Sequence, residues 1–183
     1  MNVIKPDEIK IEKLNEFHNL SKFDSYEKDL VDFLREDALN NQKQSLSLTF
    51  LWFYQEDITG YITLLTDKTS LEEELKNVFL NKNINYKSFP ALKIGRLCVH
   101  DKYLRKGLGR LMACFAMQKA IEINKDKAGC RFITVDAKKQ LGIINFYKKL
   151  NFKVLKERND KTMPMFLDLK TDIFINKGGI NPI

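Results

Sequence analysis

The chain has 183 residues, of which 44% are hydrophobic and 30% charged, and a formal net charge of +7. This composition excludes a disordered chain, and no apolar run approaches the roughly 18 residues of a membrane-spanning helix. The first residues also lack the apolar core of a secretion signal, so we expect a cytoplasmic protein without a membrane partner. The positive charge favours anionic partners such as cofactor phosphates or nucleic acid, although a solvated lysine-rich surface would give the same charge.

The first half of the chain is predicted to form a strand, a helix and a hairpin. Residues 9–14 alternate as a strand, and a helix is expected behind the cap candidates Asp24 and Ser25. Residues 46–54 and 58–66 alternate on either side of a turn, which predicts a β-hairpin. The apolar positions that predict the helix are Tyr26, Leu30, Phe33, Leu34 and Ala38.

The second half is predicted to alternate strands and helices. Helices are expected over residues 70–80, from residue 108 onward and over 141–150, and strands over 91–99, 132–135, 152–155 and 165–169. No linker or repeat divides the chain, so we expect one domain, residues 1–170, and a tail, residues 171–183. The element order predicts an α/β (α+β) fold with a mixed central sheet of about six to seven strands flanked by helices.

The first sign of function is the segment YLRKGLGRL between the fourth predicted strand and the following helix. A strand end, a short loop and a helix start leave several backbone N–H groups unpaired at the positive end of the helix dipole, which attracts phosphate. Gly107 and Gly109 carry no side chain that would keep an anion at a distance, and positive charge comes from Arg105, Lys106 and Arg110. The glycines could equally serve close packing, so the loop alone leaves both interpretations open.

A second segment, NFYKKLNF (Asn145–Phe152), places an aromatic pair on a helix that ends at an asparagine and returns into a strand. Together with RLCV (Arg96–Val99) and LRKGLGR (Leu104–Arg110), it resembles the GNAT acetyltransferase family. The phosphate loop of that family is commonly written Gln/Arg-x-x-Gly-x-Gly/Ala after a Leu-x-Val strand, and its later helix often reads Phe-Tyr-x-x-x-Gly-Phe. The resemblance extends from about Ile9 to Leu169.

The resemblance implies acetyl-coenzyme A as the co-substrate. In this family the fourth and fifth strands splay apart, the pantetheine arm enters between them, and the pyrophosphate lies on the loop before the long helix. The cofactor-binding residues that the resemblance implies are Leu97, Cys98, Val99, Arg105, Lys106, Gly107, Leu108, Gly109, Arg110 and Gln140. Among these, Gln140 stands where many relatives carry an Asn that touches the pantetheine arm.

Two positions depart from the family pattern. Leu104 stands where the family usually has Gln or Arg, which removes one side-chain contact to the cofactor, and Arg105 can compensate for it. Asn151 replaces the usual glycine before the strand. Asparagine tolerates the left-handed conformation that ends a helix better than other residues do, so we expect this substitution to be harmless.

The resemblance also implies that Tyr147 lies near the thioester sulfur and acts as the general acid. A tyrosine, with a pKa near 10, keeps its proton at neutral pH; the alternative is an ordinary core tyrosine beside Phe146. Many relatives carry a glutamate on the fourth strand as the base, but residues 91–99 contain no Asp or Glu. Because an α-amine titrates near 7.7 to 8.0 and a lysine near 10.4, the missing base slightly favours an α-amine acceptor.

The cysteines indicate no further chemistry. Cys98, Cys114 and Cys130 are odd in number and far apart, which fits neither a disulfide framework nor a Cys-x-x-Cys metal site, and we expect no metal. Cys98 could act as a thiol nucleophile, but its apolar strand neighbours favour a buried small residue.

The predicted function is therefore acetyl-coenzyme A-dependent N-acetyl transfer to a primary amine. The segments KFDSYEKDLVDFLREDAL (Lys22–Leu39) and VDAKKQ (Val135–Gln140) are similar to GNAT proteins that act as toxins by acetylating aminoacyl-tRNA, so tRNA is an alternative acceptor. A third reading, from another class, is a regulatory module that binds coenzyme A or nucleic acid and has lost catalysis. The acceptor, an antitoxin partner and a homodimer all stay open.

Overall fold

The structure, a computed structural model, describes residues 3–155 and 161–170. Within these residues seven strands follow the order β1-β2-β3-β4-β5-β7-β6 in one mixed sheet. The described residues divide into two compact units, one built from residues 3–65 and 94–116 and the other from residues 66–93, 117–155 and 161–170. The predicted single domain stays a prediction, and the predicted tail lies outside the described residues.

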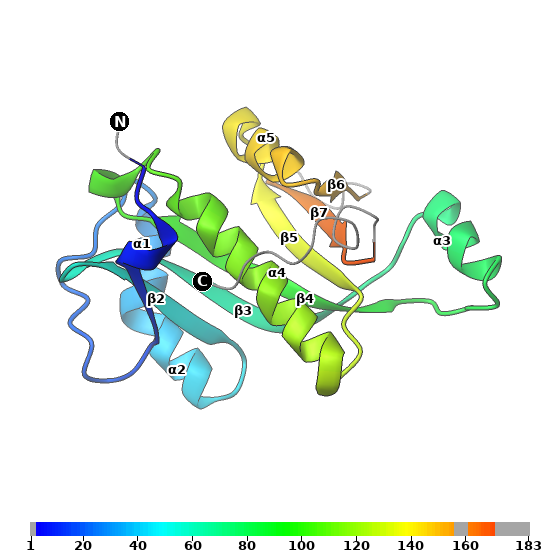
Figure 1. The fold of residues 1–183 in the computed structure, drawn as a ribbon, viewed down its shortest axis with the longest axis horizontal. Helices are drawn as coiled ribbons and strands as arrows, with labels where there is room; N and C mark the ends of the chain where they lie inside the picture. Colours follow the sequence, from blue (N-terminus) through cyan, green and yellow to red (C-terminus); the bar gives the residue numbers. More distant parts are fainter. Residues whose placement is uncertain (1–2, 156–160, 171–183) are drawn as a thin grey trace. The chain divides into compact units, whose positions relative to one another are not determined.

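Each element that the sequence predicts is present (Figure 1). The elements are η1 (Pro6–Glu8), β1 (Ile9–Lys13), α1 (Lys28–Asp32), the π-helical turn η2 (Phe33–Asp37), α2 (Ala38–Lys43), β2 (Leu48–Tyr54), β3 (Asp57–Thr69), α3 (Glu73–Leu80), β4 (Phe89–Val99), η3 (Asp101–Tyr103), α4 (Leu108–Asp126), β5 (Phe132–Lys138), α5 (Leu141–Lys149), β6 (Lys153–Val154) and β7 (Thr162–Asp168). None of the helices in the described ranges is long and apolar enough to cross a membrane.

The first helix begins later than the sequence predicts. Asp24 and Ser25 close a turn before it: the Ser25 hydroxyl accepts from the Glu27 N–H at 3.3 Å, and Asp24 Oδ1 accepts from Lys28 Nζ at 2.6 Å. The helix therefore starts at Lys28, and Tyr26, which was expected on its buried face, is 62% exposed. The predicted cap residues were wrong because their side chains bind within the preceding turn.

In the first unit, strand β2 buries side chains on both of its faces. Leu51 packs with Tyr61 of β3 in a core that includes the apolar side of α1 and α2. Phe50 and Trp52 point to the other face, where their rings lie 5.0 and 5.8 Å from the Phe115 ring of α4. Helices α1 and α2 and the first half of α4 therefore cover opposite faces of these strands (Figure 1).

A close approach at Gly60 fixes the start of α4 against the strands. A Cβ atom at Gly60 would lie 2.6 Å from the Cys98 carbonyl oxygen and would clash with Met112 Cε. Only glycine fits there, so β3, the end of β4 and the first turns of α4 pack tightly together. Next to Gly60, the Thr59 carbonyl accepts from the His100 N–H at 2.9 Å. These contacts hold both ends of the loop that joins β4 to α4.

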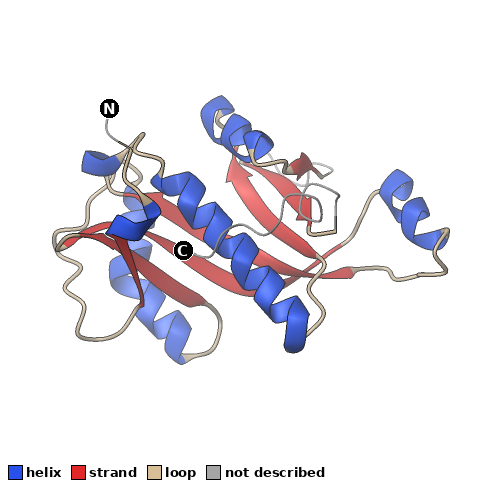
Figure 2. Cartoon of the chain, in the orientation of Figure 1, coloured by secondary structure: helices blue, strands red, loops and turns tan. Residues whose placement is uncertain are grey.

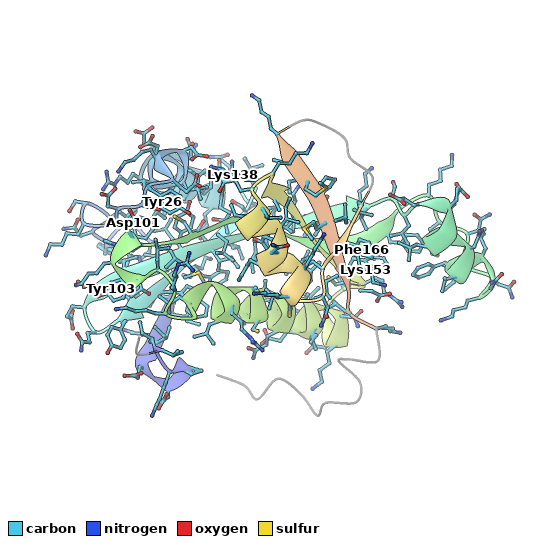
Figure 3. All side chains as sticks on the ribbon, turned by 90° about the horizontal axis from the view of Figure 1, so that it is seen from above. Tyr26, Asp101, Tyr103, Lys138, Lys153 and Phe166 are labelled. Atoms are coloured by element: carbon cyan, nitrogen blue, oxygen red, sulfur yellow. The ribbon has the colours of Figure 1, made fainter. Side chains whose placement is uncertain are left out.

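In the second unit, a hydrophobic cluster with four phenylalanines lies between α3 and the strands. The cluster consists of Phe79, Phe89, Ala91, Phe132, Leu155 and Phe166. Arg131 ties α3 to this cluster, because its guanidinium lies 5.0 Å from the Phe79 ring centroid and donates to Asp168 Oδ2 at 2.8 Å. Strand β6 pairs with β7, with Lys153 opposite Phe166 (Figure 3).

Helix α5 ends as the sequence predicts. Asn151 adopts a φ of 65°, in the left-handed region. The Phe152 N–H donates to the Tyr147 carbonyl at 3.0 Å and the Asn151 N–H to the Lys148 carbonyl at 2.9 Å, which is the paired pattern of a Schellman motif. The left-handed conformation expected of Asn151 is confirmed. The expectation that this substitution is harmless stays a prediction.

Candidate functional site

The turn η3, which follows β4, is anchored by Tyr103. The Tyr103 side chain, which is labelled in Figure 3, is buried. Its hydroxyl donates to Asp57 Oδ2, which also accepts from Lys102 Nζ at 2.8 Å. These hydrogen bonds, from Lys102 first and then from Tyr103, lower the pKa of Asp57. His100 caps the turn, since its Nδ1 accepts from the Lys102 N–H at 3.1 Å. These hydrogen bonds therefore fix the position of η3, from which the chain enters the loop.

The loop itself, which runs from η3 to the start of α4 (Figure 2), leaves backbone N–H groups without acceptors among the described residues. Arg105 and Gly107 have left-handed φ angles of 58° and 87°. Within the described residues nothing accepts from the backbone N–H groups of residues 105–109, and the first bonds inside α4 run from the Arg110 and Leu111 N–H groups to the Gly107 carbonyl, at 3.1 and 3.2 Å. Several N–H groups thus stand together at the positive end of a 19-residue helix, an arrangement that binds anions.

Three cations lie around this loop in different settings. Lys106 Nζ lies 4.8 Å from the Tyr103 ring centroid, so the ring holds its ammonium group. Arg110, in the first turn of α4, is exposed. The Arg105 side chain is exposed, and so is Leu104, at the position where the family pattern has Gln or Arg. Positive charge therefore surrounds the loop even without a polar side chain at position 104.

At the end of β4, Leu97 and Val99 are half-buried and Cys98 is buried. Burial raises the pKa of the Cys98 thiol to about 11, and a hydrogen bond with the Ser25 side chain opposes this only in part. The thiol therefore keeps its proton at neutral pH, as expected of a packing residue and not of a nucleophile. The role of these three residues as backbone partners of a pantetheine arm stays a prediction.

Tyr147 lies on α5 in the second unit, and its side chain is only 5% exposed. Its ring centroid lies 4.9 Å from that of Phe146 and 5.2 Å from that of Phe152. Burial raises the pKa of the Tyr147 hydroxyl above the ordinary value of 10.0. A hydroxyl that keeps its proton suits a general acid, and the same packing would suit a core tyrosine.

Gln140 immediately precedes α5. Its carbonyl accepts from the Ile143 and Ile144 N–H groups at 3.0 Å, while its side chain makes no capping bond. Of the predicted site residues, those from Leu97 to Arg110 thus belong to the first unit, and Gln140 and Tyr147 to the second. In the described part of the chain no three His, Cys, Asp or Glu side chains gather as metal ligands would.

Two supports of the loop are not apparent from the sequence. Asp57 anchors Tyr103 from the start of β3, and the N-terminal segment contacts the loop directly. The Ile4 N–H donates to the Lys106 carbonyl at 3.3 Å, and a Cβ at Gly107 would lie 3.4 Å from Val3 Cγ1. No local pattern predicts such contacts, because they join residues that are far apart in the sequence.

Comparison with known proteins identifies a matching family and solved structures with a similar fold. The sequence pattern of the Acetyltransferase (GNAT) family matches residues 11–152. A search of curated proteins gives no match. Among solved structures, the chain is similar to AtaT complexed with acetyl-methionyl-tRNAfMet, at 22% identity over 91% of this chain and 98% of that chain, with a TM-score of 0.78.

Two further solved structures show the same fold. One is a tyrosine-to-phenylalanine mutant of the AtaT toxin bound to the C-terminus of the antitoxin AtaR and acetyl-CoA, at 21% identity over 92% and 97% of the two chains, with a TM-score of 0.73. The other is a tyrosine-to-phenylalanine mutant of KacT, at 20% identity over 89% and 96%, with a TM-score of 0.75. The predicted fold class is confirmed, while the splay of β4 and β5 stays a prediction.

Proposed function

Because this chain belongs to the GNAT acetyltransferase family, we propose that it transfers an acetyl group from acetyl-coenzyme A to the α-amine of an aminoacyl-tRNA. The observation that carries the choice of acceptor is the likeness, over 91% of the chain, to AtaT complexed with acetyl-methionyl-tRNAfMet. The broader form of the proposal is acetyl transfer to a primary amine. An antitoxin-type partner is part of the same proposal, supported by the likeness to AtaT bound to AtaR.

The loop before α4 fits the pyrophosphate of the donor. The backbone N–H groups of residues 105–109 have no acceptor among the described residues, and three cations flank them. At Gly107 the φ of 87° excludes most other residues, so the loop stays open to an anion. We assign the pyrophosphate to this loop, and the pantetheine arm to the backbone of residues 97–99 and to Gln140.

Tyr147 is assigned the role of general acid. Acetyl-coenzyme A supplies a thioester, and the amine that attacks it displaces a thiolate. A thiolate leaves more readily when a hydroxyl protonates it, which requires an acid that still carries its proton at neutral pH. The raised pKa of the buried Tyr147 meets that requirement.

The acceptor must reach the site as a neutral amine. Strand β4 carries no Asp or Glu that could remove a proton from it. An α-amine with a pKa near 7.7 to 8.0 is partly neutral at pH 7, whereas a lysine side chain near 10.4 is almost entirely charged. The missing carboxylate therefore supports an α-amine over a lysine.

A second candidate is a regulatory module that binds coenzyme A or nucleic acid without catalysis. The exposed Leu104 and the missing base favour it, because both remove groups that active relatives commonly have. The buried, protonated Tyr147 and the left-handed Gly107 oppose it. Turnover of acetyl-coenzyme A by the purified chain separates the two candidates.

The test uses radiolabelled acetyl-coenzyme A, the purified chain and bulk tRNA charged with all amino acids. We expect label to enter the charged tRNA, and none to enter the same tRNA after deacylation or a peptide whose only amine is a lysine side chain. Label in the lysine peptide but not in charged tRNA would reject the RNA acceptor and retain the broader amine acetyltransferase. Coenzyme A binding without turnover on any acceptor would favour the regulatory module.

A further inference from the structure

We propose that the backbone N–H of Ile4 is a positioning group that orients the Lys106–Gly107 peptide for binding of the donor pyrophosphate. This inference rests on the proposed function and adds a role for the N-terminal segment, residues 3–8, which lies outside the matched residues 11–152. It concerns only the first unit, where both the segment and the loop belong.

The N-terminal segment is packed against the loop at two points. The Ile4 N–H donates to the Lys106 carbonyl at 3.3 Å, and Val3 Cγ1 lies 3.4 Å from the position of a Cβ at Gly107. The Ile4 side chain is 6% exposed, so the contact is anchored by apolar burial. Directly after it, the turn η1 is closed by a hydrogen bond from the Lys5 N–H to Glu8 Oε2 at 2.8 Å.

Because the peptide bond is planar, the hydrogen bond from Ile4 fixes the direction of the Gly107 N–H. In a trans peptide the carbonyl of one residue and the N–H of the next point in opposite directions. Since the Lys106 carbonyl points at Ile4, the Gly107 N–H points away from the N-terminal segment. It thereby stands with the other N–H groups of residues 105–109, which have no acceptor among the described residues.

The loop needs such a constraint because its own conformation does not supply one. Flipping the Lys106–Gly107 peptide changes ψ at Lys106 and φ at Gly107, and glycine tolerates both signs of φ. A bulkier residue at position 107 would resist one of the two states, but glycine lets both form. The hydrogen bond from Ile4 selects the state in which a donor, not a carbonyl oxygen, faces the anion.

The consequence for binding is electrostatic. In the flipped state the Lys106 carbonyl oxygen, which is partly negative, would face the phosphate oxygens, and one hydrogen-bond donor would be lost. The Ile4 N–H therefore acts on donor affinity and touches neither the thioester nor the acceptor. It is a positioning group, not a catalytic one.

The first test compares Ile4→Pro, which lacks the N–H, with Ile4→Val, which keeps the N–H and nearly all of the apolar side chain. Titration calorimetry with coenzyme A should show about 3- to 10-fold weaker binding for Ile4→Pro, the range expected from one net hydrogen bond, and unchanged binding for Ile4→Val. Melting temperatures, compared with that of wild type, identify any variant whose folded state is destabilised.

The second test asks whether the effect depends on the pyrophosphate. S-acetyl-pantetheine carries the thioester and the arm but no pyrophosphate, so Ile4→Pro should leave its kcat/KM unchanged. With acetyl-coenzyme A, the same variant should raise KM about 3- to 10-fold and leave kcat unchanged. If Ile4 had a merely structural role, the Ile4→Pro variant would have a lower kcat/KM with both acetyl donors.

A truncated chain that begins with Met followed by Pro6 removes Val3, Ile4 and Lys5, and with them the Ile4 N–H, and it replaces Ile4→Pro if that variant fails to fold. Coenzyme A affinity equal to wild type in folded Ile4→Pro and in the truncation would overturn the inference. Equal losses with acetyl-coenzyme A and S-acetyl-pantetheine would also overturn it. If the wild-type chain itself fails to bind coenzyme A, the proposed function fails first, which is a separate result.

Discussion

Burial and hydrogen bonding move the pKa values of Tyr147 and Asp57 in opposite directions. For Tyr147 only burial acts, which disfavours the phenolate and raises its pKa. For Asp57 the hydrogen bonds from Lys102 and Tyr103 outweigh desolvation and lower its pKa. Tyr147 therefore keeps its proton over the whole neutral range, and Asp57 is a carboxylate that braces the turn before the loop.

The proposed role of Tyr147 as general acid predicts both a rate and a pH profile. Tyr147→Phe should lower turnover by roughly 100-fold or more and leave acetyl-coenzyme A affinity unchanged, because only the proton donor is lost. A general acid must be protonated, so a pKa above 10.0 places the alkaline loss of wild-type activity from this group above that pH. Tyr86→Phe, at a position that is 65% exposed, is the matched control. Near-normal turnover of Tyr147→Phe with charged tRNA would make Tyr147 a packing residue.

The role of Asp57 predicts a loss of stability in acid. Because its pKa is lowered on folding, Asp57 stabilises the protein above its unfolded value of 3.8, and this contribution disappears as the pH falls through the lower folded value. Thermal denaturation should show Asp57→Asn less stable than wild type at pH 7, with a smaller difference at pH 3. Asp126→Asn, at the exposed end of α4, is the control. A difference that is constant from pH 7 to pH 3 would refute this role.

The element that carries the site is the loop between β4 and α4, and neighbouring elements determine its shape. Gly60 of β3 allows α4 to approach, and Tyr103 fixes the preceding turn. Ile4 then holds the loop from the N-terminal side. The loop is thus preorganised by three separate segments, which lowers the entropy that binding an anion would otherwise cost.

A charge placed in this loop should abolish donor binding without unfolding the protein. Gly107→Glu adds a negative charge beside the N–H groups and a side chain at a φ of 87°, so coenzyme A affinity should fall below detection in calorimetry. Gly129→Glu makes the same charge change where a Cβ meets nothing within 4 Å, and it should bind as wild type does. Unchanged affinity in a folded Gly107→Glu variant would remove the pyrophosphate from this loop.

Sequence patterns predicted the elements well because most of them have a local cause. Hydrophobic periodicity indicated the strands and helices, and Asn151 could be recognised as a helix-ending residue from its own chemistry. The start of α1 was predicted too early because Asp24 and Ser25 can bind in a turn as well as at a cap. The supports of the loop at Ile4 and Asp57 could not be predicted, because they depend on contacts between distant parts of the chain.

For the molecule as a whole, the net charge of +7 predicts how an RNA acceptor would respond to salt. Apparent affinity for a single strand falls by about 0.7 log unit per log unit of salt for each phosphate contacted, because bound counterions are released. Raising salt should therefore suppress acetylation of charged tRNA far more than it weakens acetyl-coenzyme A binding. A salt series with both measurements tests this, and equal salt dependence of the two would argue against an extended RNA contact.

The central claim, acetyl transfer to the α-amine of an aminoacyl-tRNA, is tested most directly by identifying the product. Charged tRNA is incubated with acetyl-coenzyme A and the purified chain, then digested with ribonuclease, and the released aminoacyl-adenosine is fragmented in a mass spectrometer. The account predicts an acetyl group on the α-nitrogen of the amino acid with wild type, and a greatly reduced yield with Tyr147→Phe. Acetyl on a nucleobase or on a lysine side-chain nitrogen, or an unmodified aminoacyl-adenosine under conditions where coenzyme A binds, would contradict it.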